Sequence, residues 1–108
     1  MIRLTVLYNL APGRDEEEFL AWRLGPMQEQ NATMPGVIRM DFARVDERYP
    51  RHLAPPYRFM TTADWADRES FEASFYDPAS LAQLEEDMNG IGDHLLFVSE
   101  ILAETKNE

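Results

Sequence analysis

The sequence predicts an α+β fold in which a four-stranded antiparallel sheet carries helices on one face. Four stretches alternate apolar and polar residues, as strands do, and two others space their apolar residues as helices do. They follow one another as strand, helix, strand, strand, helix, strand, the order of a ferredoxin-like β-α-β-β-α-β plait. We expect a single domain over residues 1–104 of the 108, followed by a loose tail at 105–108.

The first half of the chain supplies a strand, a broken helix and a second strand. Residues 2–9 alternate and predict the first strand. Asp15 then begins a helix, because its side chain can accept a hydrogen bond from the first helical amides. Gly25 and Pro26 interrupt this helix, since proline lacks a backbone donor and crowds the preceding turn. The second strand is expected over residues 37–45.

The second half again supplies a strand, a broken helix and a strand. Residues 46–56 contain three prolines and predict a long surface loop. A third strand follows at 57–65, and Asp67 is placed to cap the next helix. Asp77 precedes a proline and predicts that this helical region also has two pieces. The last strand is expected over residues 94–102.

The alternation assigns the strand residues to two faces of the sheet. One face is apolar and is predicted to form the core beneath the helices: Ile2, Leu4, Val6, Tyr8, Ile38, Met40, Phe42, Tyr57, Phe59, Trp65, Leu95, Phe97 and Ile101. The other mixes aliphatic and charged residues: Arg3, Thr5, Leu7, Asn9, Val37, Arg39, Asp41, Arg58, Met60, Thr62, Asp64, His94, Leu96, Val98 and Glu100.

The charges of the mixed face predict what covers it. Its three arginines and three carboxylates balance, although the whole chain has a net charge of −10. Two copies packed sheet to sheet would bury the aliphatic residues and pair these charges, so we expect a homodimer. The predicted strand pairing would bring together three polar pairs: Arg3 with Glu100, Asn9 with His94, and Arg39 with Asp64.

Composition excludes several functions. The 20 acidic residues against 10 basic ones disfavour nucleic-acid binding. Without cysteine there is no thiolate catalysis and no cysteine-ligated metal. Two histidines and scattered glycines predict neither a transition-metal site nor a phosphate loop, so no cofactor is expected. No signal-peptide pattern and no apolar run of about 18 residues occurs. We therefore expect a cytoplasmic protein that does not bind membranes.

Several segments in order resemble the EthD-like family of the dimeric α/β-barrel superfamily. They are IRLTVLY, the helix ending in GPM, MPGVIRMDFARV, PPYRFMTTADW followed by DRESFEASF, and HLLFVSEI, and they span residues 1–102. The resemblance implies a homodimer whose two sheets form a barrel. It also implies relatives that oxidise, cyclise or isomerise small organic molecules, often without a cofactor. EthD-like proteins are associated with degradation of organic compounds or with polyketide-type pathways.

The chain departs from the family at one position. Members commonly carry a histidine two residues before the proline of the first helix, and Leu24 stands there in this sequence. Haem-degrading members of the superfamily use a strand-one asparagine, a tryptophan at the end of strand three and an axial histidine. Asn9 and Trp65 resemble the first two, but no histidine lies between residues 67 and 92. Haem ligation of that kind is therefore not expected.

Two residues are the candidates for catalytic proton transfer. His94 lies on the mixed face, and a histidine side chain ordinarily titrates near neutral pH. Alternatively, it is a strand-end residue bonded to the backbone or to the partner subunit. Asp41 would act as a base if burial disfavoured its charged form, with Arg39 or Arg58 holding an enolate or carboxylate. Alternatively, these three residues form ion pairs that lock the dimer.

Aromatic residues form a second candidate site. At their strand and helix spacing they could line an apolar cavity for a planar ligand between sheet and helices, or they could fill an ordinary core. These residues are Tyr8, Trp22, Tyr57 and Trp65. With Arg39 and Arg58 they complete the set of predicted substrate-binding residues.

From the residues and the resemblance together, we expect a homodimer that binds a small, largely apolar organic molecule. Two chemistries fit an enzyme without a cofactor: oxygenation, as in a monooxygenase, and proton transfer such as cyclisation. The alternative is a non-catalytic ligand-binding or accessory dimer. A cavity of roughly 300 Å3 or more that touches His94 or a buried carboxylate would favour an enzyme. A filled core with every polar group paired would favour the accessory protein.

Overall fold

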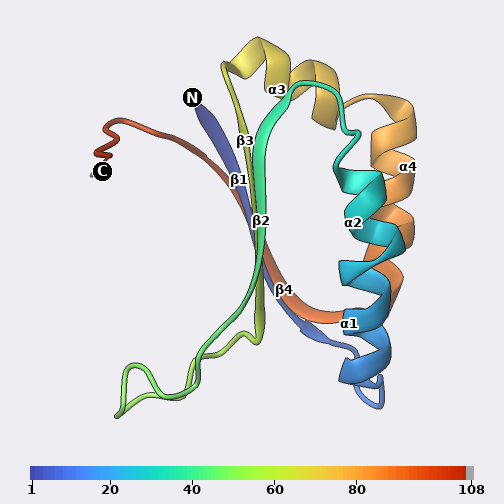
Figure 1. Ribbon diagram of the computed structural model, residues 1–108, viewed down its shortest axis with the longest axis vertical. Helices are drawn as coiled ribbons and strands as arrows, with labels where there is room; N and C mark the ends of the chain where they lie inside the picture. The colour runs from blue at the N-terminus through green and yellow to red at the C-terminus, as the bar shows by residue number, and fades with distance from the viewer. Residues whose placement is uncertain (107–108) are drawn as a thin grey trace.

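A computed structural model describes residues 1–106 and confirms the expected order of elements (Figure 1). The elements are β1 (Ile2–Leu10), α1 (Glu16–Leu24), α2 (Pro26–Asn31), β2 (Val37–Arg44), β3 (Phe59–Trp65), α3 (Arg68–Phe75), α4 (Pro78–Asp87), the short 3₁₀ turn η1 (Met88–Gly90) and β4 (Ile91–Glu100). The strands form one antiparallel sheet in the order β2-β3-β1-β4. Every helix lies on one face of this sheet, and the other face is bare (Figure 1).

The helices begin and break where the sequence predicts. The Asp15 side chain accepts a hydrogen bond from the Glu17 amide at 2.9 Å, and Asp67 accepts one from the Ser70 amide at 2.7 Å. Gly25 separates α1 from α2. A Cβ atom at this position would lie 2.9 Å from the Ala21 carbonyl oxygen, so the break favours glycine here. Among residues 1–106, no helix has both the length and the hydropathy needed to cross a membrane.

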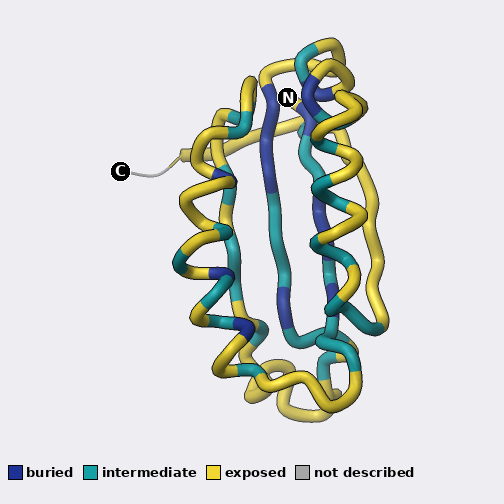
Figure 2. The backbone as a smooth tube through the Cα atoms, turned by 90° about the vertical axis from the view of Figure 1, so that its right-hand side faces the viewer, coloured by how far each residue is buried: buried dark blue, intermediate teal, exposed yellow. Residues whose placement is uncertain are grey.

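The core lies over the two central strands (Figure 2). One cluster gathers Ile2, Ala63, Trp65 and Phe71 beneath α3, and the other gathers Val6, Tyr8, Phe19 and Phe59 beneath α1. Central strands are paired on both sides and covered by helices, so their side chains lose most contact with water. By contrast, α4 has no fully buried residue and covers its part of the sheet less closely.

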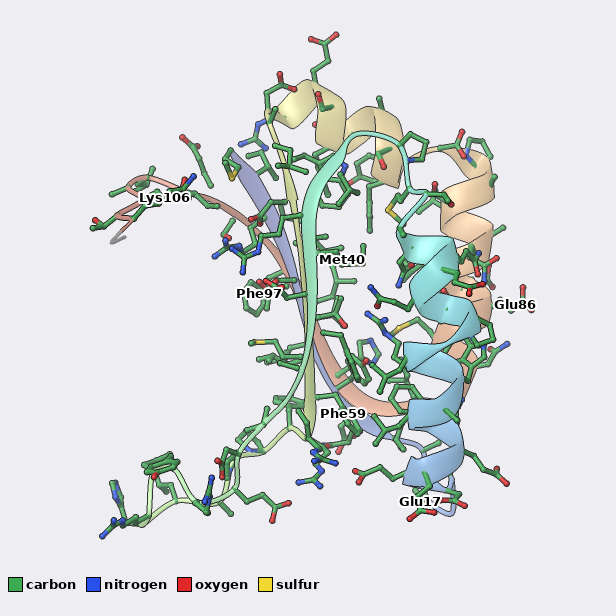
Figure 3. The ribbon with its side chains drawn as sticks, viewed as in Figure 1. Glu17, Met40, Phe59, Glu86, Phe97 and Lys106 are labelled. Carbon is green, nitrogen blue, oxygen red and sulfur yellow. The ribbon has the colours of Figure 1, made fainter. Side chains whose placement is uncertain are left out.

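The face assignment of the last strand was wrong. In the observed register Val6 opposes Leu96 and Leu4 opposes Val98, so Leu96 and Val98 lie on the helix side of the sheet. Phe97 opposes Thr5 and points to the open face, away from the helices (Figure 3). Residues 95–98 are all apolar, so an edge strand of this kind gives no alternation from which to read its faces.

The start of the second strand was also assigned to the wrong faces. The register shifts between Val37 and Arg39, and this irregularity lets Val37 pack against the Trp65 cluster. Ile38 is instead 57% exposed. From Met40 onward the alternation is regular, and Met40 points toward the helices as predicted (Figure 3).

Of the three polar pairings predicted across the mixed face, one is confirmed. Arg39 lies opposite Asp64 in the β2–β3 register. The other two pairings were wrong because they depended on the misassigned register of the last strand. The observed register places Ser99 opposite Arg3, and Tyr8 opposite His94.

Candidate functional site

A cavity of about 630 Å3 opens between α1–α2 on one side and α4–η1 on the other. Its lining residues are Arg14, Trp22, Gln30, Gln83, Glu86, Asp87, Asn89 and Gly90. The volume is within the usual range for a small-molecule site. Trp22 is the one aromatic side chain in this wall and most of the others are polar, so the mouth suits a ligand that carries polar groups.

Aromatic side chains from helix and sheet lie behind the Trp22 wall. Phe19 contacts Trp22 at a ring-centroid distance of 6.1 Å and Phe59 at 5.2 Å. Tyr8 joins the same cluster, 5.8 Å from Phe59. Helical spacing places Phe19 and Trp22 on one face of α1, and strand alternation places Tyr8 and Phe59 on the helix side of the sheet. Tyr8, Phe19 and Phe59 therefore form an aromatic floor behind the Trp22 wall, and none of the three lines the cavity itself.

Arg23 brings a buried positive charge to this region. Its residue is 4% exposed, and its guanidinium stacks on the Phe42 ring at 4.4 Å. The Nη1 group donates a hydrogen bond to Gln28 Oε1 at 3.0 Å. Within the part of the chain that the structure describes, Arg23 forms no ion pair.

Asp87 supplies a half-buried carboxylate on the opposite wall. Burial raises its pKa, while a hydrogen bond donated by Gln83 Nε2 at 2.9 Å and the charge of Arg23 act in the other direction. Burial likewise raises the pKa of Tyr8, opposed by Thr61 and by Arg23. Of these groups only Asp87 lines the cavity, and a carboxylate whose pKa is raised by burial is a candidate for proton transfer to or from a ligand there.

The sequence-predicted catalytic residues lie elsewhere. Asp41 is on the open face, where its carboxylate pairs with Arg39 at 3.0 Å and both side chains are more than half exposed. His94 lies on the exposed edge strand, with Nδ1 3.2 Å from the Gly92 carbonyl oxygen. Neither lines the cavity between the helices. The structure does not bring His94 and Asp41 together.

The predicted binding residues divide among several places. Tyr8 and Trp22 belong to the aromatic floor and wall already described. Trp65 is buried in the other core cluster, and Tyr57 is half-buried just before β3. Arg58 pairs with Glu16 at 2.9 Å and with Glu47 at 2.8 Å, so its charge is already balanced.

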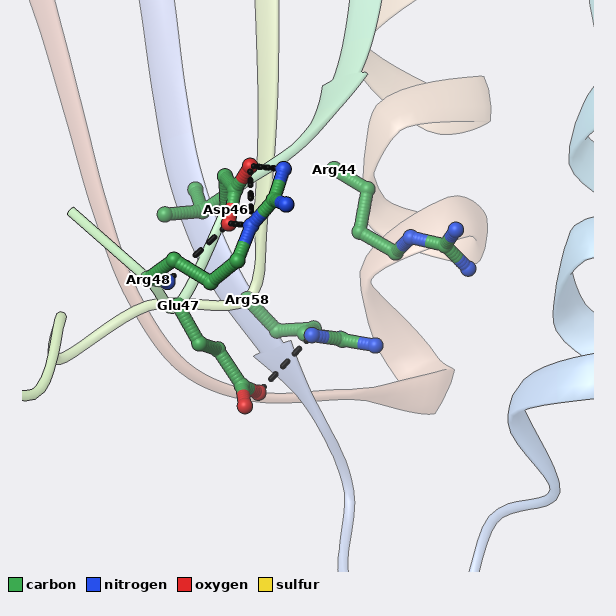
Figure 4. Close-up of a pocket in the computed structure, with 6 residues that line it drawn as sticks. Arg44, Asp46, Glu47, Arg48 and Arg58 are labelled. Carbon is green, nitrogen blue, oxygen red and sulfur yellow. Dashed lines mark hydrogen bonds and ion pairs between the residues drawn. The ribbon is translucent and has the colours of Figure 1, made fainter.

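A second hollow of about 490 Å3 lies beside Arg58 at the far end of β2 (Figure 4). Its charged side chains are Arg44, Asp46, Glu47, Arg48 and Arg58. Asp46 and Arg48 form their own ion pair at 2.6 Å. Most of the charges around this hollow are already paired with one another, so it is the weaker candidate for a ligand site.

Sequence reasoning missed Arg23 and Asp87. Arg23 did leave a signal, because it lies four residues after Phe19 on the buried face of α1, where a charge is unexpected. Asp87 left none, since it ends an acidic run that is typical of a solvated helix surface. No group of three or more histidine or acidic side chains within residues 1–106 is placed to hold a metal ion.

Comparison with known proteins shows similarity in structure. No protein-family model matches the sequence, and no curated protein matches it. An ethyl tert-butyl ether D (EthD) family protein of Bacillus halodurans superimposes with a TM-score of 0.76 at 20% identity, covering 94% of this chain and 99% of that one. A dimeric ferredoxin-like protein of Thermobifida fusca has a TM-score of 0.70 at 17% identity, covering 93% and 90%.

A protein with a named activity has a similar structure. Hydroxynitrile lyase from Passiflora edulis superimposes with a TM-score of 0.72 at 14% identity, covering 98% of this chain and 96% of the lyase. At these identities the similarity concerns the fold. The chain thus has the ferredoxin-like fold of an EthD family protein, as its sequence segments predicted.

Proposed function

We propose that the protein is an EthD-like homodimer that binds a small organic molecule between α1–α2 and α4–η1 and acts on it by proton transfer. The observation that carries this proposal is the cavity of about 630 Å3 bordered by Asp87. Burial raises the pKa of this carboxylate, which is the direction expected of a general base. We therefore assign to Asp87 the proton-transfer role that the sequence predicted for His94 or Asp41.

The aromatic floor supports a ligand with a planar body. Trp22 lines the cavity and contacts Phe19, whose ring lies 5.2 Å from Phe59. The Trp22 ring can stack on a flat molecule, and the rings packed behind it hold it in place. The hydroxynitrile lyase of similar structure supports an enzymatic use of this fold. None of the residues that line the cavity specifically favours oxygenation over proton transfer.

The open face supports the homodimer. Leu95 is 50% exposed and Phe97 is 47% exposed there, which a lone subunit would leave in water. The loop after β2 and the chain after β4 both extend to the open side of the sheet (Figure 1). They would lie on either side of a second sheet packed against this face. The Thermobifida fusca protein of similar structure is dimeric.

A non-catalytic accessory dimer is the second candidate. It is favoured by Leu24, which replaces the histidine common in the EthD-like family. The Leu24 side chain is 61% exposed and does not line the cavity. The groups around Asp87 are therefore independent of the substitution, and the enzymatic proposal has the stronger support.

Filling the cavity tests whether it binds ligands. Gln83→Trp would place an indole in the space, while Leu24→Trp adds the same group at an exposed position of α1. With 2-tetralone, a ketone fused to a flat benzene ring, as the probe, we expect wild type and Leu24→Trp to bind in a calorimetric titration. Gln83→Trp should lose at least about tenfold in affinity. Equal binding by all three proteins would reject this cavity as the site.

A further inference from the structure

Arg14 is the one basic residue among the described residues that line the cavity between α1–α2 and α4–η1. It lies in the loop between β1 and α1 and is exposed, so a ligand that enters the cavity can reach its guanidinium. Within residues 1–106 no carboxylate oxygen lies within 4.0 Å of its nitrogens, although Glu86 and Asp87 line the same cavity. The positive charge is therefore available to a ligand.

Contacts with both sides of the cavity position the Arg14 guanidinium. Its Cζ atom lies 5.1 Å from the centre of the Phe19 ring and 6.0 Å from that of the Trp22 ring, both on α1. On the other side it packs against Gly90 of η1, where a Cβ atom would overlap the guanidinium. The Ala11 amide also donates a hydrogen bond to the Gly90 carbonyl oxygen at 3.1 Å, which ties the loop that carries Arg14 to η1.

The contact with Gly90 brings Arg14 close to Asp87 without pairing the two. Asp87 is the last residue of α4 and directly precedes η1, so Gly90 follows it by three residues. Residues at this spacing in a 3₁₀ turn lie one above the other on the same face. The guanidinium against Gly90 therefore lies about one helical turn from Asp87. Ligand atoms that enter this part of the cavity meet a cation on one side and a carboxylate on the other.

We propose that Arg14 binds the carbonyl oxygen of the substrate and stabilises the negative charge that forms on it when Asp87 removes a proton from the adjacent carbon. The carbon–hydrogen bond breaks, the proton binds an Asp87 oxygen, and the electron pair moves into an enolate. A guanidinium at the enolate oxygen stabilises this charge more than it stabilises the neutral ketone. The amides of Gln30 and Asn89 also line the cavity, but uncharged donors would stabilise an enolate less.

This inference rests on the proposed function and narrows the substrate class. A base and a cation placed on either side of a ligand suit a carbonyl compound that has a hydrogen on the carbon next to the carbonyl group. The flat part of such a molecule can stack on Trp22.

The exchange of the α-protons of 2-tetralone in D2O, followed by NMR, measures the proposed step. We expect wild-type protein to accelerate it, and Arg14→Gln to lower kcat by at least about tenfold with less than about a threefold change in KM. Arg14→Lys keeps a positive charge and should retain more activity than Arg14→Gln. Arg68→Gln removes a charge from the exposed start of α3 and should keep the wild-type rate.

Gly90→Ala moves the guanidinium while leaving Arg14 in the chain. The added Cβ atom would displace it, so we expect kcat to fall toward that of Arg14→Gln. In the Arg14→Gln background the same change should have less than about a twofold further effect, because no guanidinium is left to displace. An equal loss in both backgrounds would contradict the positioning of Arg14 and overturn the inference.

Binding of 2-naphthol gives a readout that needs no turnover. This molecule carries the oxygen of the 2-tetralone enol on a flat ring system, and its ionised form has the charge of the enolate. We expect the pKa of bound 2-naphthol, followed by absorbance, to be at least about one unit lower in wild type than in Arg14→Gln. Glu86 and Asp87 favour the neutral naphthol, but both proteins contain them, so the comparison isolates Arg14.

The outcomes separate this inference from the proposed function. Wild-type kcat in Arg14→Gln, a change confined to KM, or equal pKa values for 2-naphthol bound to the two proteins would overturn the role of Arg14 and leave Asp87 as the base. No acceleration by wild type would overturn both. If Arg14→Gln does not fold, Gly90→Ala decides: an unchanged kcat together with an unchanged pKa of bound 2-naphthol would overturn the inference.

Discussion

Arg3 and Asp64 form a two-pronged ion pair on the open face, with Nε 2.7 Å from Oδ1 and Nη2 3.0 Å from Oδ2. The pair joins the neighbouring strands β1 and β3, where the two residues lie directly opposite each other. The Asp64 side chain is 7% exposed although no helix covers this face. A carboxylate so little exposed depends on its partner, because both of its oxygens would otherwise lose their hydrogen bonds.

Removing this carboxylate should destabilise the protein. For Asp64→Asn we expect the free energy of unfolding to fall by about 1–3 kcal/mol, since the buried side chain loses its charge-assisted hydrogen bonds with Arg3. Urea unfolding monitored by circular dichroism measures the change. Asp46→Asn breaks the exposed pair with Arg48 in the loop after β2 and serves as the matched control, with a change of less than about 1 kcal/mol expected. Equal destabilisation by both variants would contradict the distinction drawn between the two pairs.

The open face should control assembly. Phe97→Glu places a charge on this face, on the edge strand β4 opposite Thr5. It should convert the dimer to monomers, because the dimer would bury this carboxylate without a partner. Sedimentation velocity at micromolar concentration measures the outcome. Leu24→Glu introduces the same charge on the helix side, where Leu24 is already exposed, and should remain dimeric. Monomeric wild-type protein would overturn the dimer itself.

The fold could be predicted from sequence because each local signal agrees with the others. Asp15, Asp67 and Asp77 cap the helices whose starts they predict. Apolar and polar residues alternate clearly along β1 and β3, because helices cover one face of these strands and not the other. The faces of β4 could not be predicted, since its run of apolar residues 95–98 fits either register.

The candidate site could be predicted only in part, for a physical reason. Tyr8 and Trp22 could be identified as candidates because they are large aromatic residues at the spacing of a strand and a helix. The role of Asp87 depends on how far α4 stands from α1, a tertiary distance that no local pattern encodes. His94 and Asp41 were chosen by residue type on a face that the structure leaves outside the cavity.

The pH dependence of stability should reveal the burial of Asp87. Because burial raises its pKa, the folded protein holds this proton more tightly than the unfolded chain does. The stability contributed by that proton is fully present below the ordinary aspartate pKa of 3.8 and is lost as the pH rises through the raised value. Asp87→Asn is always neutral and escapes this loss.

The measurement compares urea unfolding of wild type and Asp87→Asn at several pH values. We expect the stability of Asp87→Asn relative to wild type to increase as the pH rises above about 4 and then to level off. Asp93→Asn, at an exposed position of β4, provides the control and should show no such increase. A difference that falls with rising pH would mean that the pKa of Asp87 is lowered in the folded protein.

The central claim, that proton transfer belongs to Asp87 and not to His94 or Asp41, can be tested in one assay. The α-proton exchange of 2-tetralone in D2O, followed by NMR, reports abstraction of a proton from carbon. We expect wild-type protein to accelerate this exchange over buffer and Asp87→Asn to lose at least about 100-fold of the acceleration. His94→Ala and Asp41→Asn should keep the wild-type rate. Full activity of Asp87→Asn, loss of activity in either of the other variants, or no acceleration by wild type would contradict the account.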